Sequence, residues 1–273
     1  MPVTDLSSLQ DDLDLLRFAG AQAAAVAMRH FNTKLDVRWK DGLSPVTNAD
    51  MEVDDYLKAT LLAARPAYGW LSEETADSPE RLSARRTFVV DPIDGTRAFI
   101  AGKDVWCVSI AIVENHRSAA GYLNCPVRRE VFSAVEGEGA RLNGRPMAKL
   151  QLRQPIRLSG PKPLLAALPA AFAARCAFQP NVPSLAYRIA MIAAGALDGT
   201  IVKPNSHDWD LAASELILRE CGGALHDLNG TTPHFATANP AHGALIAGNG
   251  DVMPALLQAA KIAAAALSPS MAS

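Results

Sequence analysis

One stretch decides the fold, and it reads Phe88-Val89-Val90-Asp91-Pro92-Ile93-Asp94-Gly95-Thr96. Its first three residues are apolar, which predicts a short buried strand that runs straight into a proline-stiffened turn. Residues 97–101 then continue as a short helical stretch. Two carboxylates, Asp91 and Asp94, therefore stand at the carboxyl end of a strand on either side of the Ile93 carbonyl. Hard oxygen ligands of this kind suit Mg²⁺.

Taken alone, this stretch could also be an ordinary Asp-Gly turn with surface acids. Three further acidic elements favour the metal site. Asp50 lies in the first turn of a predicted helix, Glu73-Glu74 follows a strand-like apolar stretch at residues 68–71, and Asp210 opens another predicted helix. Singly, these would be a helix-dipole partner, solvated loop charges and an N-cap. Together with Asp91 and Asp94 they indicate one acidic site.

The elements before about residue 150 predict an α+β portion. Ser8 and Asp11 form a capping box for a long amphipathic helix, and Thr47 or Asn48 caps a second helix that ends at Arg65-Pro66. Residues 105–113, 119–125 and 131–136 are rich in β-formers and separated by Gly or Pro, which predicts meandering antiparallel strands closed by a turn at Asn143-Gly144.

The elements after about residue 150 predict a smaller α/β layer, because short strands alternate with Ala-rich helices. The expected strands are 156–158, 199–202, 224–227 and 243–247, and the expected helices are 163–175, 184–194, 210–221 and 252–267. We therefore divide the chain into an N-terminal portion, residues 1–150, and a C-terminal portion, residues 151–273, with the site at their junction.

Composition excludes several other classes of protein. Of 273 residues, 49% are hydrophobic and 20% charged, as in soluble globular proteins. With 26 basic against 28 acidic residues, no global field exists to hold nucleic acid or anionic lipid. The acidic N-terminal region does not resemble a signal peptide, and no apolar run is long enough to span a membrane. The four scattered cysteines indicate reduced thiols, so we expect a cytoplasmic protein.

These motifs give the chain a specific resemblance, which covers nearly the whole sequence. The 91–96 stretch, Glu73-Glu74-Thr75 upstream and Trp209-Asp210-Leu211-Ala212-Ala213 downstream resemble, in order and spacing, the signatures of the inositol monophosphatase family of Mg²⁺-dependent, lithium-sensitive phosphatases. Residues 45–50 match a weaker fourth segment. The resemblance implies a layered αβαβα sandwich, a small-molecule phosphate ester as partner, and a homodimer.

The resemblance also implies a role for each matching residue. Glu73, Asp91 and the Ile93 carbonyl would hold one Mg²⁺, and Asp91, Asp94 and Asp210 a second, with a third, looser ion sharing Glu73. Thr96 and Asp50 would be the pair that orients the attacking water, and Glu74 would support the ligands. Asp94, Gly95, Thr96 and Asp210 would also face the substrate.

Two positions leave the substrate open. Animal inositol enzymes carry an acidic residue against the inositol ring where this chain has Lys203, and a cation there suits an anionic substituent better. Ser159 follows a strand where family members contact substrate, although Ser-Gly is also a common turn. Inositol monophosphate is the leading substrate, with a 3′(2′),5′-bisphosphate nucleotide and histidinol phosphate as alternatives.

A catalytic triad and a non-catalytic role are the two alternatives to a metal-dependent phosphatase. His207 and Asp208 could belong to a catalytic triad, but no nucleophile-elbow motif presents a serine, so His207 more simply orients the loop before Asp210. Some bacterial members of the family are known as extragenic suppressors that act on RNA-handling machinery, which makes a non-catalytic regulatory role the rival from another class. Such a protein would be free to lose metal ligands, and none is missing here.

Overall fold

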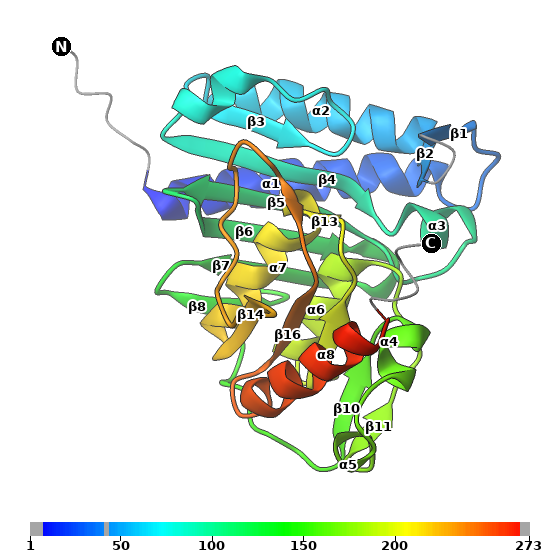
Figure 1. Ribbon diagram of the computed structural model, residues 1–273. Helices are drawn as coiled ribbons and strands as arrows, with labels where there is room; N and C mark the ends of the chain where they lie inside the picture. Colours follow the sequence, from blue (N-terminus) through cyan, green and yellow to red (C-terminus); the bar gives the residue numbers. More distant parts are fainter. Residues whose placement is uncertain (1–7, 41–43, 268–273) are drawn as a thin grey trace.

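The computed structural model describes residues 8–40 and 44–267, which form five stacked layers in the order αβαβα (Figure 1). Two helices cover the outer face of a seven-stranded sheet, and two more fill the space between this sheet and a five-stranded sheet. A last layer of helices lies on the far side of the second sheet. The expected layered α/β sandwich is thus confirmed, while the division into portions at residue 150 stays a prediction.

The outer helix layer consists of α1 (Leu9–His30) and α2 (Asn48–Ala64). The predicted capping box at Ser8 is present, and Thr47, one of the two residues expected to cap α2, is its N-cap and forms a second capping box with Asp50. Asp12 anchors α1 to the sheet edge although it is fully buried. Its carboxylate accepts hydrogen bonds from Arg65 Nε at 2.9 Å, Arg86 Nη1 at 2.8 Å and the Tyr68 hydroxyl at 2.8 Å.

The large sheet follows the chain in simple order from β3 to β9. Neighbouring strands are antiparallel except for the first pair, β3 and β4, which run parallel. The turn at Asn143 and Gly144 joins the last two strands, with both residues at positive φ as a tight hairpin requires. The strands are β3 (Gly69–Ser72), β4 (Arg86–Asp94), β5 (Cys107–Glu114), β6 (Arg117–Cys125), β7 (Glu130–Val135), β8 (Gly139–Leu142) and β9 (Arg145–Pro146).

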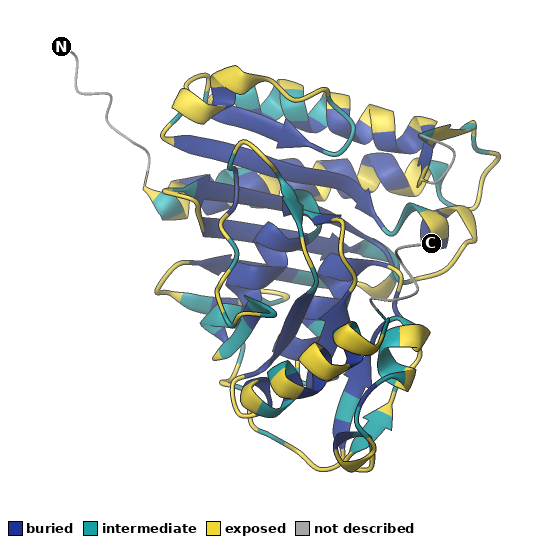
Figure 2. Ribbon diagram, viewed as in Figure 1, coloured by how far each residue is buried: buried dark blue, intermediate teal, exposed yellow. Residues whose placement is uncertain are grey.

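The middle layer consists of α6 (Leu185–Ala193) and α7 (Asp208–Glu220), which pack on each other and against both sheets. These are the most buried helices in the part of the chain that is described, and Figure 2 shows them in dark blue at the centre of the molecule. They join the two sheets through one continuous apolar cluster, so the two halves of the molecule share a core.

The second sheet is mixed, in the order β11-β10-β12-β16-β14. Its strands are β10 (Ile156–Ser159), β11 (Cys176–Phe178), β12 (Gly199–Val202), β14 (Gly223–Asp227) and β16 (Leu245–Asn249), and α8 (Met253–Leu267) covers its outer face. The single helix expected at 163–175 is wrong. Two short helices, α4 (Lys162–Ala166) and α5 (Ala170–Ala173), replace it, because Pro169 lacks an N–H and disfavours helical geometry at Leu168.

Several small elements were not predicted. Strands β1 (Val37–Lys40) and β2 (Ser44–Thr47) form one antiparallel pair, and β13 (Ser206–His207) and β15 (Ala241–His242) form another. The 3₁₀ turns η1 (Pro79–Ser83) and η2 (Pro126–Arg128) were not predicted either, whereas α3 (Thr96–Ile100) matches the short helical stretch expected at residues 97–101. All four cysteines are unpaired, as expected. Within residues 8–40 and 44–267, no helix is long and apolar enough to cross a membrane.

Candidate active site

The carboxyl end of β4 places Asp91 and Asp94 on the same side of the strand. In a regular strand, residues three apart point to opposite faces. Here Asp91 pairs with Ser109 and Asp94 with Cys107, so β4 contains one extra residue between them and forms a bulge at Pro92-Ile93. The bulge turns the second carboxylate toward the first. Both side chains are nearly inaccessible to solvent.

Glu73 reaches the same place because β3 and β4 are parallel. Parallel neighbours end at the same edge of a sheet, so the residue after β3 lies beside the end of β4. The Glu73 N–H donates to the Val90 carbonyl at 3.2 Å, which extends the ladder by one bond. Repulsion from Asp210 adds to the rise in the pKa of Glu73, and repulsion from Glu73 adds to the rise in the pKa of Asp91, so the Glu73 carboxylate lies near both aspartates.

Asp210 completes a compact group of oxygens. It is the third residue of α7, not its first, since α7 begins at Asp208. One carboxylate oxygen each from Asp91, Asp94 and Asp210 lie within 4.8 Å of one another, a spacing that allows all three to contact one divalent ion. Asp91 and Asp94 are far from Asp210 in the sequence, and the packing of α7 on β4 brings the three together.

Three helices start at this site, and a site carboxylate bonds the first turn of each. Asp50 accepts from the Thr47 N–H at 2.8 Å at the start of α2, and Asp210 accepts from the His207 N–H at 2.7 Å at the start of α7. Asp94 bonds the start of α6, accepting from the amides of Leu185 at 3.2 Å and Ala186 at 2.7 Å and from the Ser184 hydroxyl at 2.5 Å. The positive ends of these helix dipoles therefore face the negative side chains.

Thr96 and Asp50 lie in contact, as the resemblance implies for the water-orienting pair. Thr96 Oγ1 lies 3.2 Å from Asp50 Oδ1 and 3.1 Å from the Ile93 carbonyl, so its single proton is shared between two acceptors. Gly95, before it, has φ +94°, and an added Cβ would lie 3.0 Å from Ser184 Cβ and 3.2 Å from the Val105 carbonyl. Only glycine fits that turn without strain.

Burial and mutual repulsion make the carboxylates reluctant to ionise. Burial raises the pKa of Glu73 to about 8, and repulsion from Asp210 adds to the rise. Burial, then repulsion from Asp94, raises the pKa of Asp210 to about 7. The pKa values of Asp91 and Asp94 are also raised, chiefly by burial. A bound cation would relieve this cost, which is the electrostatic signature of a metal site.

Two basic residues that the sequence did not single out compensate part of the charge. Lys40 extends from β1, and its Nζ lies 2.5 Å from Glu74 Oε2, 3.7 Å from Glu73 Oε1 and 3.2 Å from the Glu73 carbonyl. Arg188 on α6 is 5% exposed, and its charge acts on Asp94 and Asp210. The only sequence signal for Arg188 was a charge inside an otherwise apolar helix at residues 185–193.

Ser159 and Lys203, the remaining predicted substrate residues, form no hydrogen bond or ion pair with these carboxylates within the described residues. The Ser159 side chain is fully buried, and its hydroxyl donates to the Pro180 carbonyl at 2.9 Å inside the second sheet. Lys203, just after β12, is exposed. A substrate contact by either residue stays a prediction. Glu74 forms an ion pair with Lys40, and its role as a supporting residue stays a prediction.

His207 and Trp209 stack with ring centroids 4.6 Å apart, directly before Asp210. Asp208 is fully buried, accepting from the Ala236 N–H at 2.7 Å and pairing with His242 Nε2 at 2.7 Å. This carboxylate thus fastens the start of α7 to the β13–β15 pair. These contacts fix the start of α7, and the expected role of His207 in orienting the loop stays a prediction. No serine hydroxyl is hydrogen-bonded to His207 or His242 among the described residues.

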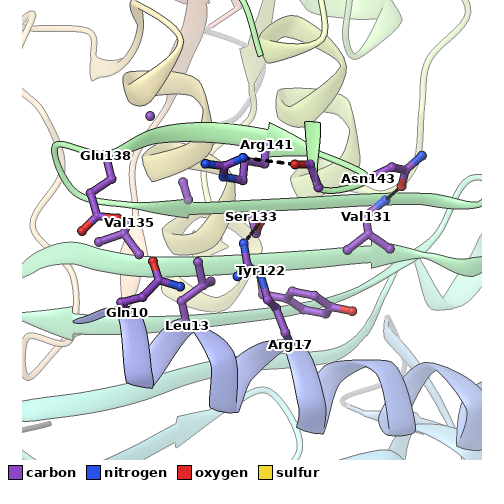
Figure 3. A pocket seen from close by; sticks show the side chains of 13 residues that line it. Gln10, Leu13, Arg17, Tyr122, Val131, Ser133, Val135, Glu138, Arg141 and Asn143 are labelled. Atoms are coloured by element: carbon purple, nitrogen blue, oxygen red, sulfur yellow. Dashed lines mark hydrogen bonds between the residues drawn. The ribbon is translucent and has the colours of Figure 1, made fainter. Parts of the chain in front are cut away.

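Two grooves lie elsewhere on the molecule. One, of about 720 Å³, lies between α1 and strands β6 to β8, where Arg17 and Tyr122 face Arg141 and Glu138 (Figure 3). The other, of about 780 Å³, follows the segment that joins the two sheets and is lined by Arg145, Lys149 and Arg157 among others. No residue of the carboxylate group lines either groove in the described part of the chain. We therefore place the candidate active site at the carboxylate group and not in either groove.

Comparison with known proteins gives this arrangement a family. The sequence profile of the inositol monophosphatase family matches residues 9–266. The chain belongs to the inositol monophosphatase family. The family's members are phosphatases, so the chain has the ancestry and the carboxylate set of an enzyme that hydrolyses phosphate monoesters.

Relatives within the family differ in substrate. The chain is 30% identical to the 3′(2′),5′-bisphosphate nucleotidase CysQ of Aggregatibacter actinomycetemcomitans, over 84% of this chain and 87% of the relative. It is also 30% identical to the inositol-1-monophosphatase of Mesorhizobium japonicum, over 91% of this chain and 96% of that relative. Among solved structures, the extragenic suppressor protein suhB of Bartonella henselae superposes with a TM-score of 0.82 at 27% identity, covering 92% of this chain and 98% of that one.

Proposed function

We propose that the protein hydrolyses a small phosphate monoester with Mg²⁺ as cofactor and water as the nucleophile. The observation that carries this proposal is the convergence of Asp91, Asp94 and Asp210 within 4.8 Å, next to Glu73 and the Thr96–Asp50 pair. All donors are oxygens, which favours Mg²⁺ over softer metals. Their raised pKa values mean that the group is strained without a cation, so the residues present fit the ion.

In this proposal each residue has the role that the family resemblance implies. Glu73, Asp91 and the Ile93 carbonyl would hold one ion, Asp91, Asp94 and Asp210 a second, and Glu73 would share a third. When bound, Mg²⁺ neutralises phosphoryl and leaving-group charge and acidifies water. Thr96 accepts a hydrogen bond from the attacking water while its own proton points to Asp50 or Ile93, and Asp50 has a pKa raised by burial, which suits it to receive a proton.

Inositol monophosphate is the leading substrate on the family resemblance, and histidinol phosphate remains an alternative. A bisphosphate nucleotide is favoured by one specific observation. Arg188 donates to Asn181 Oδ1 at 3.1 Å and the Val182 carbonyl at 2.8 Å, while its buried Nε has no hydrogen-bond partner among the described residues. Burial lowers its pKa to about 10, so it is still cationic at neutral pH. A substrate with a second negative group would gain from that charge.

The deciding experiment is a phosphate-release screen with and without Mg²⁺ over inositol phosphates, adenosine 3′,5′-bisphosphate, histidinol phosphate and sugar phosphates. Arg188→Met should lower kcat/KM for the bisphosphate by about tenfold to a hundredfold and affect inositol monophosphate less, since a charge-assisted contact contributes roughly 1 to 3 kcal/mol. Lys203→Glu should act in the same direction if Lys203 reaches the substrate. The exposed Arg145→Met is the matched control.

If the protein releases phosphate from none of these substrates in the presence of Mg²⁺, the proposal is overturned and the non-catalytic alternative is favoured. Lithium inhibition, a homodimer and a cytoplasmic location are further expectations from the resemblance. Titration of the phosphatase activity with LiCl tests the first, and light scattering of the purified protein tests the second.

A further inference from the structure

Asp54 is a buried acid that belongs to none of the roles described so far. It lies on α2 one turn after Asp50, and only 1% of the residue is exposed. No basic side chain forms an ion pair with it among the described residues. A buried carboxylate without a cation is costly unless hydrogen bonds satisfy it, so its partners are informative.

Those partners bracket the loop that carries Glu73. The Ser72 hydroxyl donates to Asp54 Oδ1, and the Thr75 hydroxyl donates to Asp54 Oδ2. Ser72 immediately precedes Glu73-Glu74, and Thr75 immediately follows, so the two carboxylate oxygens hold both ends of one short loop. With its proton committed to Asp54, the Ser72 oxygen accepts from the Glu74 N–H at 3.4 Å.

The charge on Asp54 has a directional effect that a neutral residue would not reproduce. A carboxylate only accepts, so both hydroxyls must point their protons toward it. An amide in the same place would donate with its NH₂ group and would turn one hydroxyl away. The other ties on this loop are the Glu73 N–H to the Val90 carbonyl, at 3.2 Å, and Lys40. Asp54 is therefore what joins the loop to the helix that carries Asp50.

We propose that Asp54 is a positioning residue that sets the location of the Glu73 carboxylate, and hence the affinity for Mg²⁺, through Ser72 and Thr75. The inference rests on the proposed function, in which Glu73 is a metal ligand. In this proposal Asp54 acts through Ser72 and Thr75 and is not itself a ligand of metal or substrate. Its removal should thus weaken Mg²⁺ binding while leaving the Thr96–Asp50 pair, and the chemistry at saturating Mg²⁺, much less affected.

The test is calorimetric titration of Mg²⁺ into wild-type, Asp54→Asn and Asp55→Asn proteins, with circular dichroism to check folding. Asp55 is the exposed neighbour on the same helix, so its variant makes the same change in charge without the contacts. Partners that orient a ligand typically contribute ten- to a hundredfold to metal affinity, so we expect Asp54→Asn to weaken Mg²⁺ binding by roughly that factor and Asp55→Asn to leave it unchanged. The Mg²⁺ concentration for half-maximal activity should rise in parallel, with kcat nearly constant.

A second set of variants tests whether Asp54 acts through Ser72 and Thr75. Its single substitutions at Thr75 do not require the Asp54→Asn protein to fold. Thr75→Val should weaken Mg²⁺ binding, Thr75→Ser should restore it, and adding Asp54→Asn to Ser72→Ala/Thr75→Val should cost little more. Equal Mg²⁺ affinity in wild-type and Thr75→Val proteins, or in the Asp54→Asn and Asp55→Asn proteins, would overturn the inference. If the wild-type protein itself does not bind Mg²⁺, the proposed function fails instead, and the inference with it.

Discussion

Replacing Glu73 with Gln should stabilise the metal-free protein at pH 8 and have little effect near pH 4.5, although it removes a proposed ligand. Burial and repulsion from Asp210 raise the pKa of Glu73 from 4.5 to about 8. Between these values the folded state binds more protons than the unfolded state, so stability falls as pH rises through the window. Well below pH 4.5 the side chain is neutral in both states, and at pH 4.5 itself the difference is only about 0.4 kcal/mol.

The size of the effect follows from the same shift. Each unit of pH inside the window costs up to about 1.4 kcal/mol, which gives a ceiling of about 4 kcal/mol between pH 5 and pH 8. The Glu73 side chain is 22% exposed, and solvent screening should halve this value, leaving about 2 kcal/mol. For a chain of this size that corresponds to a gain in Tm of roughly 4 to 8 °C at pH 8.

The assay is thermal unfolding in EDTA at pH 5, 6.5 and 8, followed by the same series with Mg²⁺. Exposed Glu138→Gln is the matched control and should not change Tm. Mg²⁺ should raise the Tm of the wild-type protein and much less that of Glu73→Gln, so the order of stability reverses when the metal is added. A metal-free Glu73→Gln protein no more stable than wild type at pH 8 would refute the reasoning.

Three further outcomes are expected. Asp91→Asn should lower the rate of phosphate release by more than about a hundredfold, which is the upper end of the loss for residues that only orient ligands. The circular dichroism spectrum should be unchanged. A wild-type rate at saturating Mg²⁺ would contradict the assignment of Asp91 as a metal ligand. Thr96→Ala should lower kcat more than it raises KM, and Thr96→Ser is the control. When the reaction runs in ¹⁸O-labelled water, the label should appear in the released phosphate. A trapped phosphoenzyme would exclude direct attack by water. Asp12→Ala should lower the free energy of unfolding in urea by about 3 to 5 kcal/mol, because it leaves the buried Arg86 without one of its acceptors; a loss below 1 kcal/mol would mean that this pair is not structural.

Much of the fold was predictable because its signals are local. The capping boxes at Ser8 and Thr47, the apolar strand before Asp91 and the turn at Asn143-Gly144 each depend on residues close in sequence. The error at 163–175 is different in kind. An Ala-rich run favours a helix on average, but the single residue Pro169 outweighs the run because it removes a hydrogen bond.

The acidic part of the site was predictable for the same reason, and its basic part was not. Asp91 and Asp94 belong to a recognisable local motif. Lys40 contacts Glu74 only because β1 pairs with β2, and no pattern in the sequence predicts that pair of strands. Arg188 and Asp54 stand on helices whose periodicity indicates an apolar side but not which charged residue is buried with it. Their roles depend on contacts between distant segments, which no local pattern encodes.

The bonding of site carboxylates to helix starts has a consequence for how such a protein would lose its activity in evolution. Asp50, Asp94 and Asp210 each satisfy backbone groups at the start of a helix, so selection for folding alone would retain them after catalysis had become unnecessary. Asp91 likewise satisfies a backbone group, the Ile93 N–H at 3.0 Å. Among the described residues, the Glu73 side chain accepts no backbone hydrogen bond, and its loss would relieve repulsion in the metal-free protein. In a lineage drifting toward a purely structural or regulatory role, position 73 is therefore where the first substitution should become fixed, and it is the position to inspect when asking whether a relative of this chain is still an enzyme.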